Sequence, residues 1–314
     1  MRITRRVLTA SLLTMALAAP AFAADKPLIL ISVPGMNFPF FVHMMKAFKA
    51  AADQQGLDTI EGDGQMSSPK QTADIEAALA KGVKGIVLSP NEVDAMAPAL
   101  QEAIDAHVPV VTVDRRVPSV TGIIGHVGAD NVKGGEAQGD LIEKMFPNGA
   151  TIINLQGTPG ASPAIDRNKG LHDVLDKAKD KYKIVFEQTA NFERDKGLSV
   201  TEGALASMAT PPQVIVAGND DMALGALEAV KARNLKGIAI IGFDALPETL
   251  GKIRDGEITA TVEQFPGKQS ATAVAIMANY LKTAAKPAQQ IELLTPVAIT
   301  KDNLKEAERL DEVK

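Results

Sequence analysis

The sequence has no cysteine and no tryptophan, and its 314 residues include only two tyrosines. The absence of cysteine excludes disulfide bonds, thiolate catalysis, zinc sites built on cysteine and a lipid-modified cysteine at a processing site. Basic runs are scarce too, because the formal net charge is −5 and Lys and Arg are scattered along most of the chain. This charge balance argues against nucleic acids and anionic membrane surfaces as partners.

Long apolar runs are scarce as well, and one of them lies at the start of the chain. Three arginines within the first six residues precede an apolar stretch of about a dozen residues and the small-x-small triplet 21–23. This order predicts a secretory signal peptide over residues 1–23. A membrane anchor, the alternative, would need about 20 apolar residues. Loss of the three arginines changes the net charge from −5 to −8, and we expect a soluble protein exported to the periplasm.

Short runs rich in Val, Ile and Leu alternate with helical patterns from residue 27 onward. Near-continuous apolar runs between helices are typical of parallel strands that are buried on both faces. The fold class that this pattern predicts is α/β, with doubly wound parallel sheets. The strands are expected at 28–33, 57–63, 85–90, 108–114, 150–157, 183–190, 213–220, 238–245 and 258–265.

The length of the chain favours two domains. The alternation of strands and helices starts again near residue 150, and the segment 125–131, "GHVGADN", offers small residues that could absorb backbone rotation. No linker rich in Gly, Ser or Pro separates the halves. We therefore expect two lobes joined by short crossings of the chain.

Ligands of open parallel sheets bind beyond the carboxyl ends of the strands. The residues that follow the predicted strands are therefore candidates for a binding site, together with Arg167, which follows the loop 157–166. The candidates at strand ends are Asn37, Phe38, Phe40, Phe41, Asp63, Asn91, Asp114, Arg115, Asn219, Asp220, Asp244 and Gln264.

The chemistry of these candidates suits a small, uncharged molecule with many hydroxyl groups. Carboxylates accept hydrogen bonds, Arg donates them and amides do both, so together they can pair several neighbouring hydroxyls. Phenyl rings can cover the C–H faces of a ring-shaped polyol and exclude water. Alternatives remain: Phe40 and Phe41 could pack the start of the first helix, and Asp63, Asn91 and Asp220 could cap the helices that follow them.

The motifs of common enzyme classes are missing. The loop 157–166 has glycines but no Lys of a phosphate-binding loop, and the chain has no G-x-S-x-G. The histidines at 43, 107, 126 and 172 form no H-E-x-x-H pattern. We therefore expect no catalysis, no cofactor and no metal.

Five segments together resemble the periplasmic sugar-binding proteins of ABC importers, in the ribose-binding branch of the type I fold. They are "TVDR" (112–115), "GADNVKGG" (128–135), "NDDMALGAL" (219–227), "IGFDALPE" (241–248) and "ATVEQFPG" (260–267), and the likeness covers essentially all of residues 24–314. The segments "EQTAN", "GFDALPE" and "TPVAITKDNLKEA" look closer in sequence to the myo-inositol-binding members of this family.

The resemblance implies two lobes that close on a ligand about a multi-strand hinge. It places residues 24–128 plus about 265–291 in the N-terminal lobe, and 129–264 plus about 292–314 in the C-terminal lobe. It implies a monomer that delivers its ligand to a membrane permease, and a chemoreceptor is a compatible further partner. In the family, residues that match Phe40, Phe41 and Phe192 stack on the ligand, and its hydroxyls are held by residues that match Asp114, Arg115, Arg167, Asn219, Asp244 and Gln264.

One position departs from the ribose-binding pattern. Ribose binders carry Asn immediately before the Pro of the first motif, where this chain has Phe38. A hydroxyl partner is thereby lost and an apolar surface gained, so the resemblance favours myo-inositol or a related cyclitol or sugar. Ribose or another aldose or alditol is the alternative ligand.

Two other classes of protein share features with this chain. The effector domain of a sugar-responsive repressor has the same fold, but a DNA-binding helix-turn-helix would stand where this chain has its predicted signal peptide. An exported sugar-modifying enzyme is disfavoured by the missing motifs.

Overall fold

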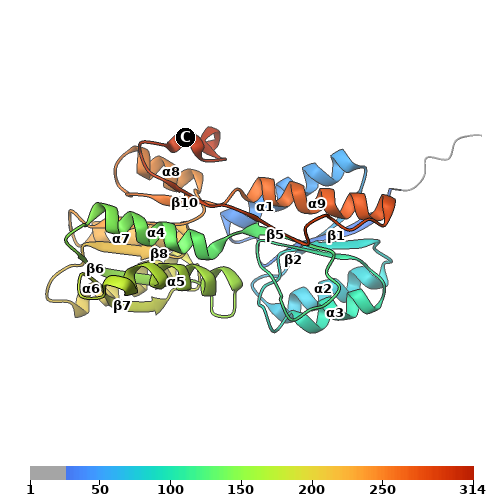
Figure 1. Ribbon diagram of the computed structural model, residues 1–314, viewed down its shortest axis with the longest axis horizontal. Helices are drawn as coiled ribbons and strands as arrows, with labels where there is room; N and C mark the ends of the chain where they lie inside the picture. The colour runs from blue at the N-terminus through green and yellow to red at the C-terminus, as the bar shows by residue number, and fades with distance from the viewer. Residues whose placement is uncertain (1–25) are drawn as a thin grey trace, which may run out of the picture.

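The computed structural model describes residues 26–314, and the predicted signal peptide lies outside them. Figure 1 shows two lobes side by side, each built on its own sheet. The sheet of the first lobe has the order β11-β5-β4-β3-β1-β2, and that of the second has the order β7-β6-β8-β9. All pairings within these two sheets are parallel, which confirms the predicted fold class.

The strands of the first sheet are β1 (Leu28–Val33), β2 (Asp58–Asp63), β3 (Gly85–Leu88), β4 (Val110–Val113), β5 (Gly125–Ala129) and β11 (Ile291–Leu294). Those of the second are β6 (Ala150–Gln156), β7 (Tyr182–Thr189), β8 (Val214–Ala217) and β9 (Ala239–Ile241). A third, two-stranded sheet joins β10 (Thr261–Glu263) to β12 (Val297–Ile299).

Helices cover both faces of each main sheet. In the first lobe α1 (Pro39–Gln55) and α9 (Pro266–Thr283) lie on one face, and α2 (Ser68–Ala80) and α3 (Ala97–Asp105) on the other. In the second, α4 (Asn131–Met145) and α5 (Ser162–Leu175) face α6 (Arg194–Ser207) and α7 (Asp220–Ala232) across the sheet. The remaining elements are α8 (Pro247–Arg254), η1 (Asp176–Ala178), η2 (Leu304–Glu306) and η3 (Leu310–Glu312).

Alternate residues of each strand reach opposite cores, as the pleat of a sheet requires. In β1, Ile29 and Ile31 pack toward α1, whereas Leu30 packs with the cluster that contains α2 and α3 residues. All three side chains are fully buried. This two-sided burial explains why the strands read as continuous apolar runs in the sequence.

One predicted strand differs in direction from the expectation. The sequence predicts a parallel strand over 258–265, but β10 pairs with β12 in antiparallel fashion and only Ala260 bridges Ile241 in parallel. Neither β12, the partner of β10, nor β11, the partner of β5, was predicted, because both strands are short and only partly buried. The antiparallel direction depends on β12, far along the chain, and no local pattern in 258–265 indicates it.

The chain passes between the lobes after Ala129, after Glu263 and after Leu294, where strands of one sheet lead into elements of the other lobe. We propose these three crossings as the hinge. The first two lie close to the boundaries expected at 128/129 and 264/265. The third was expected near residue 291, but β11 pairs with β5 in the first sheet, so this crossing lies at residues 295–296.

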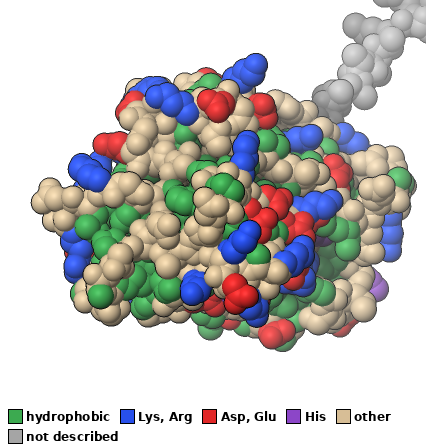
Figure 2. Space-filling model, turned by 60° about the vertical axis from the view of Figure 1, so that its left-hand side comes forward, with side chains coloured by type: hydrophobic (Ala, Val, Ile, Leu, Met, Phe, Trp, Pro, Cys, Tyr) green, Lys and Arg blue, Asp and Glu red, His purple; other side chains and the backbone are tan. Residues whose placement is uncertain are grey.

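Two further features bear on partners. Within residues 26–314, no helix is both long and apolar enough to cross a membrane. On the face of the molecule shown in Figure 2, acidic and basic side chains are interspersed. That mixture differs from the one-sided positive surface on which nucleic acids are bound.

Candidate functional site

A cavity between the two lobes is lined by most of the residues that the sequence analysis named as candidates. Its lining consists of Phe38, Phe40, Phe41, Asp114, Arg115, Pro163, Arg167, Phe192, Asn219, Asp244 and Gln264. Every candidate that the resemblance singled out is among them.

Pro163 is the one lining residue that the sequence analysis missed. It stands in the first turn of α5, four residues before Arg167, so the two side chains share one face of the helix. A proline at this place reads as an ordinary helix start, which hides its position in the cleft. Its spacing from Arg167 is the signal that could have found it.

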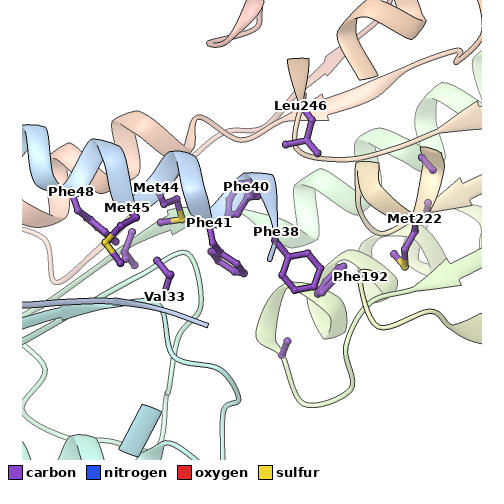
Figure 3. Close-up of a cluster of buried hydrophobic side chains, with 14 of the residues drawn as sticks. Val33, Phe38, Phe40, Phe41, Met44, Met45, Phe48, Phe192, Met222 and Leu246 are labelled. Atoms are coloured by element: carbon purple, nitrogen blue, oxygen red, sulfur yellow. The ribbon is translucent and has the colours of Figure 1, made fainter. Parts of the chain in front are cut away.

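Phenyl rings form the apolar wall of the cavity. Phe38 precedes the first residue of α1, and its ring meets that of Phe41 edge to face at 6.1 Å. The rings of Phe40 and Phe41 are 5.3 Å apart, again edge to face. Phe192 approaches Phe38 from the other lobe (Figure 3). The rings also belong to the hydrophobic core, so packing of the helix start and lining of the cavity are roles that they combine.

Two charged residues of the first lobe follow β4. Asp114 has a φ of 60°, a conformation that non-glycine residues seldom adopt, and it accepts a hydrogen bond from Ser89 Oγ at 2.9 Å. Arg115 donates from Nη1 to the carbonyl of Asn91 at 2.6 Å and pairs through Nε with Asp114 at 3.8 Å. Its guanidinium lies 5.3 Å from the ring centre of Phe41. Within residues 26–314 the buried Nε of Arg115 has no hydrogen-bond acceptor.

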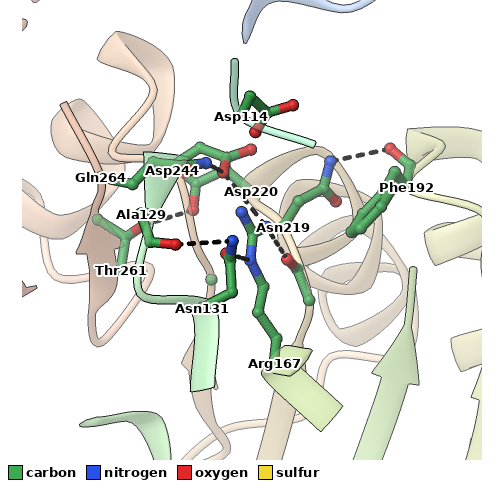
Figure 4. A network of polar contacts seen from close by, with 12 residues as sticks. Asp114, Ala129, Asn131, Arg167, Phe192, Asn219, Asp220, Asp244, Thr261 and Gln264 are labelled. Atoms are coloured by element: carbon green, nitrogen blue, oxygen red, sulfur yellow. Dashed lines mark hydrogen bonds and ion pairs between the residues drawn. The ribbon is translucent and has the colours of Figure 1, made fainter. Parts of the chain in front are cut away.

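Arg167 occupies the opposite wall. Its Nε donates to Asn131 Oδ1 at 2.8 Å and its Nη1 to the carbonyl of Gly218 at 2.7 Å. The guanidinium stacks on Phe243, with 3.6 Å between Cζ and the ring centre. Nη1 also lies 3.5 Å from Asp244 Oδ1, as Figure 4 shows. These contacts fix the orientation of the planar guanidinium group.

Amide side chains complete this wall. Asn219 caps α7 by accepting from the backbone N–H of Met222 at 3.0 Å, and its Nδ2 donates to the carbonyl of Phe192 at 3.0 Å. Gln264 donates from Nε2 to Asp244 Oδ1 at 2.6 Å. Capping and lining are therefore combined in Asn219.

Burial dominates the electrostatics of the cavity. It raises the pKa of Asp244 to about 7, against the opposing attraction of Arg167. Burial likewise raises the pKa of Asp114 while Arg115 acts to lower it, and burial lowers the pKa of Arg115 to about 10. A ligand that supplies hydrogen bonds in place of water stabilises buried charges of this kind.

Four strand-end candidates lie outside the cavity lining, namely Asn37, Asp63, Asn91 and Asp220. The last three form hydrogen bonds elsewhere in the structure. Asp63 accepts from the N–H groups of Met36 and Gln65, at 3.1 and 3.0 Å. Asn91 donates from Nδ2 to Ser68 Oγ at 3.0 Å. Asp220 is fully buried and bonded to the loop before α8. None of these last three residues caps the helix that follows it, because Ser67, Met96 and Asn219 occupy the N-cap positions of α2, α3 and α7. The capping alternative is therefore wrong for Asp63, Asn91 and Asp220.

A set of contacts joins the two lobes through residues that do not line the cavity. The guanidinium of Arg116, after β4, pairs with both carboxylate oxygens of Asp166 in α5. The N–H of Arg116 donates to Ser162 Oγ at 3.0 Å, and that of Val93 to the carbonyl of Gly160 at 3.0 Å. We call these five residues the clasp. The sequence analysis missed it, because its partners come from different lobes.

The fold and the cavity together define a two-lobed binding protein of parallel-sheet type. Comparison with known proteins then supplies the family. Residues 29–286 match the family described as the periplasmic binding protein domain. The chain belongs to that family.

Several relatives carry a named ligand. A crystal structure of the myo-inositol binding protein of Caulobacter, bound to myo-inositol, superimposes with a TM-score of 0.88 at 41% identity and covers 91% of this chain and 97% of its own. A solute-binding protein of Bacillus halodurans with bound myo-inositol gives 0.84 at 25% identity, covering 91% and 98%. The ribose import binding protein of Bacillus subtilis is 39% identical over 236 residues, 75% of each chain.

Proposed function

We propose that this protein is the periplasmic substrate-binding component of an ABC sugar importer, and that its ligand is myo-inositol or a related cyclitol or sugar. The cavity carries the proposal. Apolar rings meet carboxylates, guanidinium groups and amides around one cavity between the lobes. Such a lining offers donors and acceptors to several hydroxyls and covers the C–H faces of a small ring. Membership of the family implies the periplasmic location.

Phe38 favours a cyclitol over ribose. It lines the cavity with 5% of its surface exposed, at the place where the ribose-binding pattern has Asn. The two solved relatives with myo-inositol in their cleft support the same choice. Ribose stays the second candidate, because a ribose import binding protein is 39% identical to this chain.

Closure of the lobes is the mechanism that this site supports. Phe40, Phe41 and Asp114 belong to the first lobe, whereas Arg167 and Asn219 belong to the second. A ligand that touches both walls binds the closed form better than the open form, and it shifts the equilibrium by that difference in affinity. The closed form is then what the membrane permease would recognise.

A thermal-shift screen tests the proposal. The protein without residues 1–23 is unfolded and refolded to remove any bound ligand, then screened against myo-inositol, other cyclitols, pentoses, hexoses and alditols. Ligand at 100 times its dissociation constant adds about 2.7 kcal/mol to the stability, which raises the melting temperature by several degrees. Titration calorimetry then gives the affinities.

The outcome of the screen distinguishes between the candidate ligands. A shift with myo-inositol alone supports the cyclitol ligand, and Phe38→Asn should then weaken myo-inositol and improve ribose. A shift with ribose or another aldose alone would contradict the cyclitol choice and leave the transport function standing. No shift with any member of the panel would overturn the polyol site.

A further inference from the structure

The segment that presents Asp244 to the cavity has an unusual backbone. Asp244 has a φ of 110° and Ala245 a φ of 49°. Side-chain-bearing residues rarely adopt such conformations, and they persist only where the surroundings hold them in place. The carboxylate of Asp244 therefore depends on whatever holds these two residues.

Two buried side chains hold this segment. The N–H of Ala245 donates to Thr261 Oγ1 at 3.2 Å, and the N–H of Leu246 donates to Asp220 Oδ2 at 2.7 Å. The hydroxyl of Thr261 in turn donates to Asp220 Oδ1 at 2.7 Å (Figure 4). Both oxygens of Asp220 are thus occupied, one by the turn that follows Asp244 and one by the hydroxyl that supports this turn.

The space for this carboxylate is built into the fold. Asp220 and Thr261 have no exposed surface. A Cβ atom at Gly242 would lie 2.1 Å from Asp220 Oδ1, so glycine at this position is what admits the carboxylate. Asp220 is absent from the cavity lining, and its N–H donates to the carbonyl of Phe243 at 2.7 Å, immediately before Asp244. These contacts converge on one short segment.

We infer that Asp220 and Thr261 are positioning residues that fix the carboxylate of Asp244 in the cavity before the ligand arrives. The inference rests on the proposed function, in which Asp244 contacts the ligand. With its backbone held, Asp244 stays 2.6 Å from Gln264 Nε2 and 3.5 Å from Arg167 Nη1. Binding then does not have to order this segment, which strengthens affinity by preorganisation.

The first test needs no ligand. Hydrogen–deuterium exchange of the backbone amides of residues 243–246 is measured in Thr261→Val, Thr261→Ser and Asp220→Asn. Exchange should quicken in the valine and asparagine variants and stay at the wild-type rate in the serine variant, which keeps the hydroxyl. Thr249→Val is the matched control, because Thr249 is also fully buried but its hydroxyl has no partner within residues 26–314.

The second test asks whether the effect passes through Asp244. With myo-inositol and ribose as probes, Thr261→Val should weaken binding about tenfold, the loss expected for one buried hydrogen bond. In the Asp244→Ala background, titrated at high ligand concentration, the same substitution should have almost no further effect on affinity. In the Asp114→Ala background it should keep its full effect, because Asp114 lies in the other lobe.

Unchanged exchange in Thr261→Val, or an equal loss of affinity with and without Asp244, would overturn the positioning role. If the wild-type protein binds neither probe, the proposed ligand is wrong. The exchange measurement then decides the inference by itself.

Discussion

At the scale of single residues, the cavity depends on charges that burial makes costly. Asp114 and Asp244 each have a raised pKa, and each has a positive backbone φ. Charged partners from the same wall, Arg115 and Arg167, offset part of the cost of burial. A change that removes one member of such a pair leaves the other uncompensated.

Asp114→Ala should therefore weaken ligand binding severely. Loss of one partner of a buried, hydrogen-bonded charge pair costs on the order of 2–5 kcal/mol, which corresponds to a loss of affinity of about thirtyfold to several thousandfold. Titration calorimetry with the ligand found in the screen measures this. Near-normal binding by a correctly folded variant would contradict the assignment of Asp114 to the site.

Asp244 should make the stability of the ligand-free protein depend on pH. An unfolded Asp titrates near pH 4, whereas the pKa of Asp244 is about 7 in the folded protein. The folded state therefore holds a proton that the unfolded chain has released, and the stability from this group is complete below about pH 4 and is lost as the pH rises through 7. Relative to Asp244→Asn, the wild-type free energy of unfolding should fall by up to roughly 4 kcal/mol over this range.

Urea denaturation at several pH values gives this difference. His126 acts in the opposite direction, because burial lowers its pKa to about 4 and the unfolded state takes up its proton first. Subtraction of the Asp244→Asn curve removes that contribution along with those of other groups. A difference that stays flat between pH 4 and 7 would show that Asp244 is ionised throughout.

At the scale of elements, close backbone contact between helices positions Arg167. A Cβ atom at Gly135 in α4 would lie 2.0 Å from the carbonyl oxygen of Arg167 in α5. The two helices also meet at Gly170, where a Cβ atom would lie 2.0 Å from the carbonyl of Val132. Because the obstructing atoms are backbone, only movement of a whole helix can make room.

Gly135→Ala should consequently destabilise the protein by about 1–3 kcal/mol, the usual cost of overpacking, and weaken binding because α5 carries Arg167 outward. Gly203→Ala is the matched control: this glycine lies on the exposed side of α6 and a Cβ atom there meets nothing within 4 Å. That variant should gain roughly 0.5–1 kcal/mol. Thermal unfolding and calorimetry on both variants give the comparison, and equal effects would rule out the helix contact as the cause.

At the scale of the whole molecule, the clasp joins the two lobes through residues that do not line the cavity. In its pair of Arg116 and Asp166, the side chain of Arg116 is 39% exposed and that of Asp166 11% exposed. Partial exposure limits its strength to about 1 kcal/mol or less. Any contact of this kind favours closure equally for every ligand, since none of its atoms lines the cavity.

Arg116→Ala and Asp166→Ala should each lower affinity about twofold to fivefold, by the same factor for every sugar that binds. The double variant should be no worse than either single one, since both remove the same interaction. Small-angle scattering of the ligand-free variants should show a larger radius of gyration. Lys169→Ala is the control, because its ion pair with Asp173 stays within α5. A change in ligand preference would place Arg116 in the site instead.

The two-sheet α/β fold and the chemistry of the cleft follow from the amino-acid sequence alone. Strands buried on both faces are continuously apolar, so β1 and β8 can be predicted from their residues. The carboxyl ends of parallel strands meet along one edge of a sheet, and that rule was enough to predict Asp114, Asn219 and Asp244 as residues of the site.

The division of the strand-end residues into those that line the cavity and those that support it arises from tertiary packing. Asp220 and Asp244 both follow strands, yet Asp220 turns inward to the segment after β9, where Gly242 leaves room for its carboxylate. The clasp, the place of Pro163 and the antiparallel pairing of β10 with β12 likewise depend on segments far apart in the chain. Local sequence patterns do not indicate these contacts, because tertiary packing creates them.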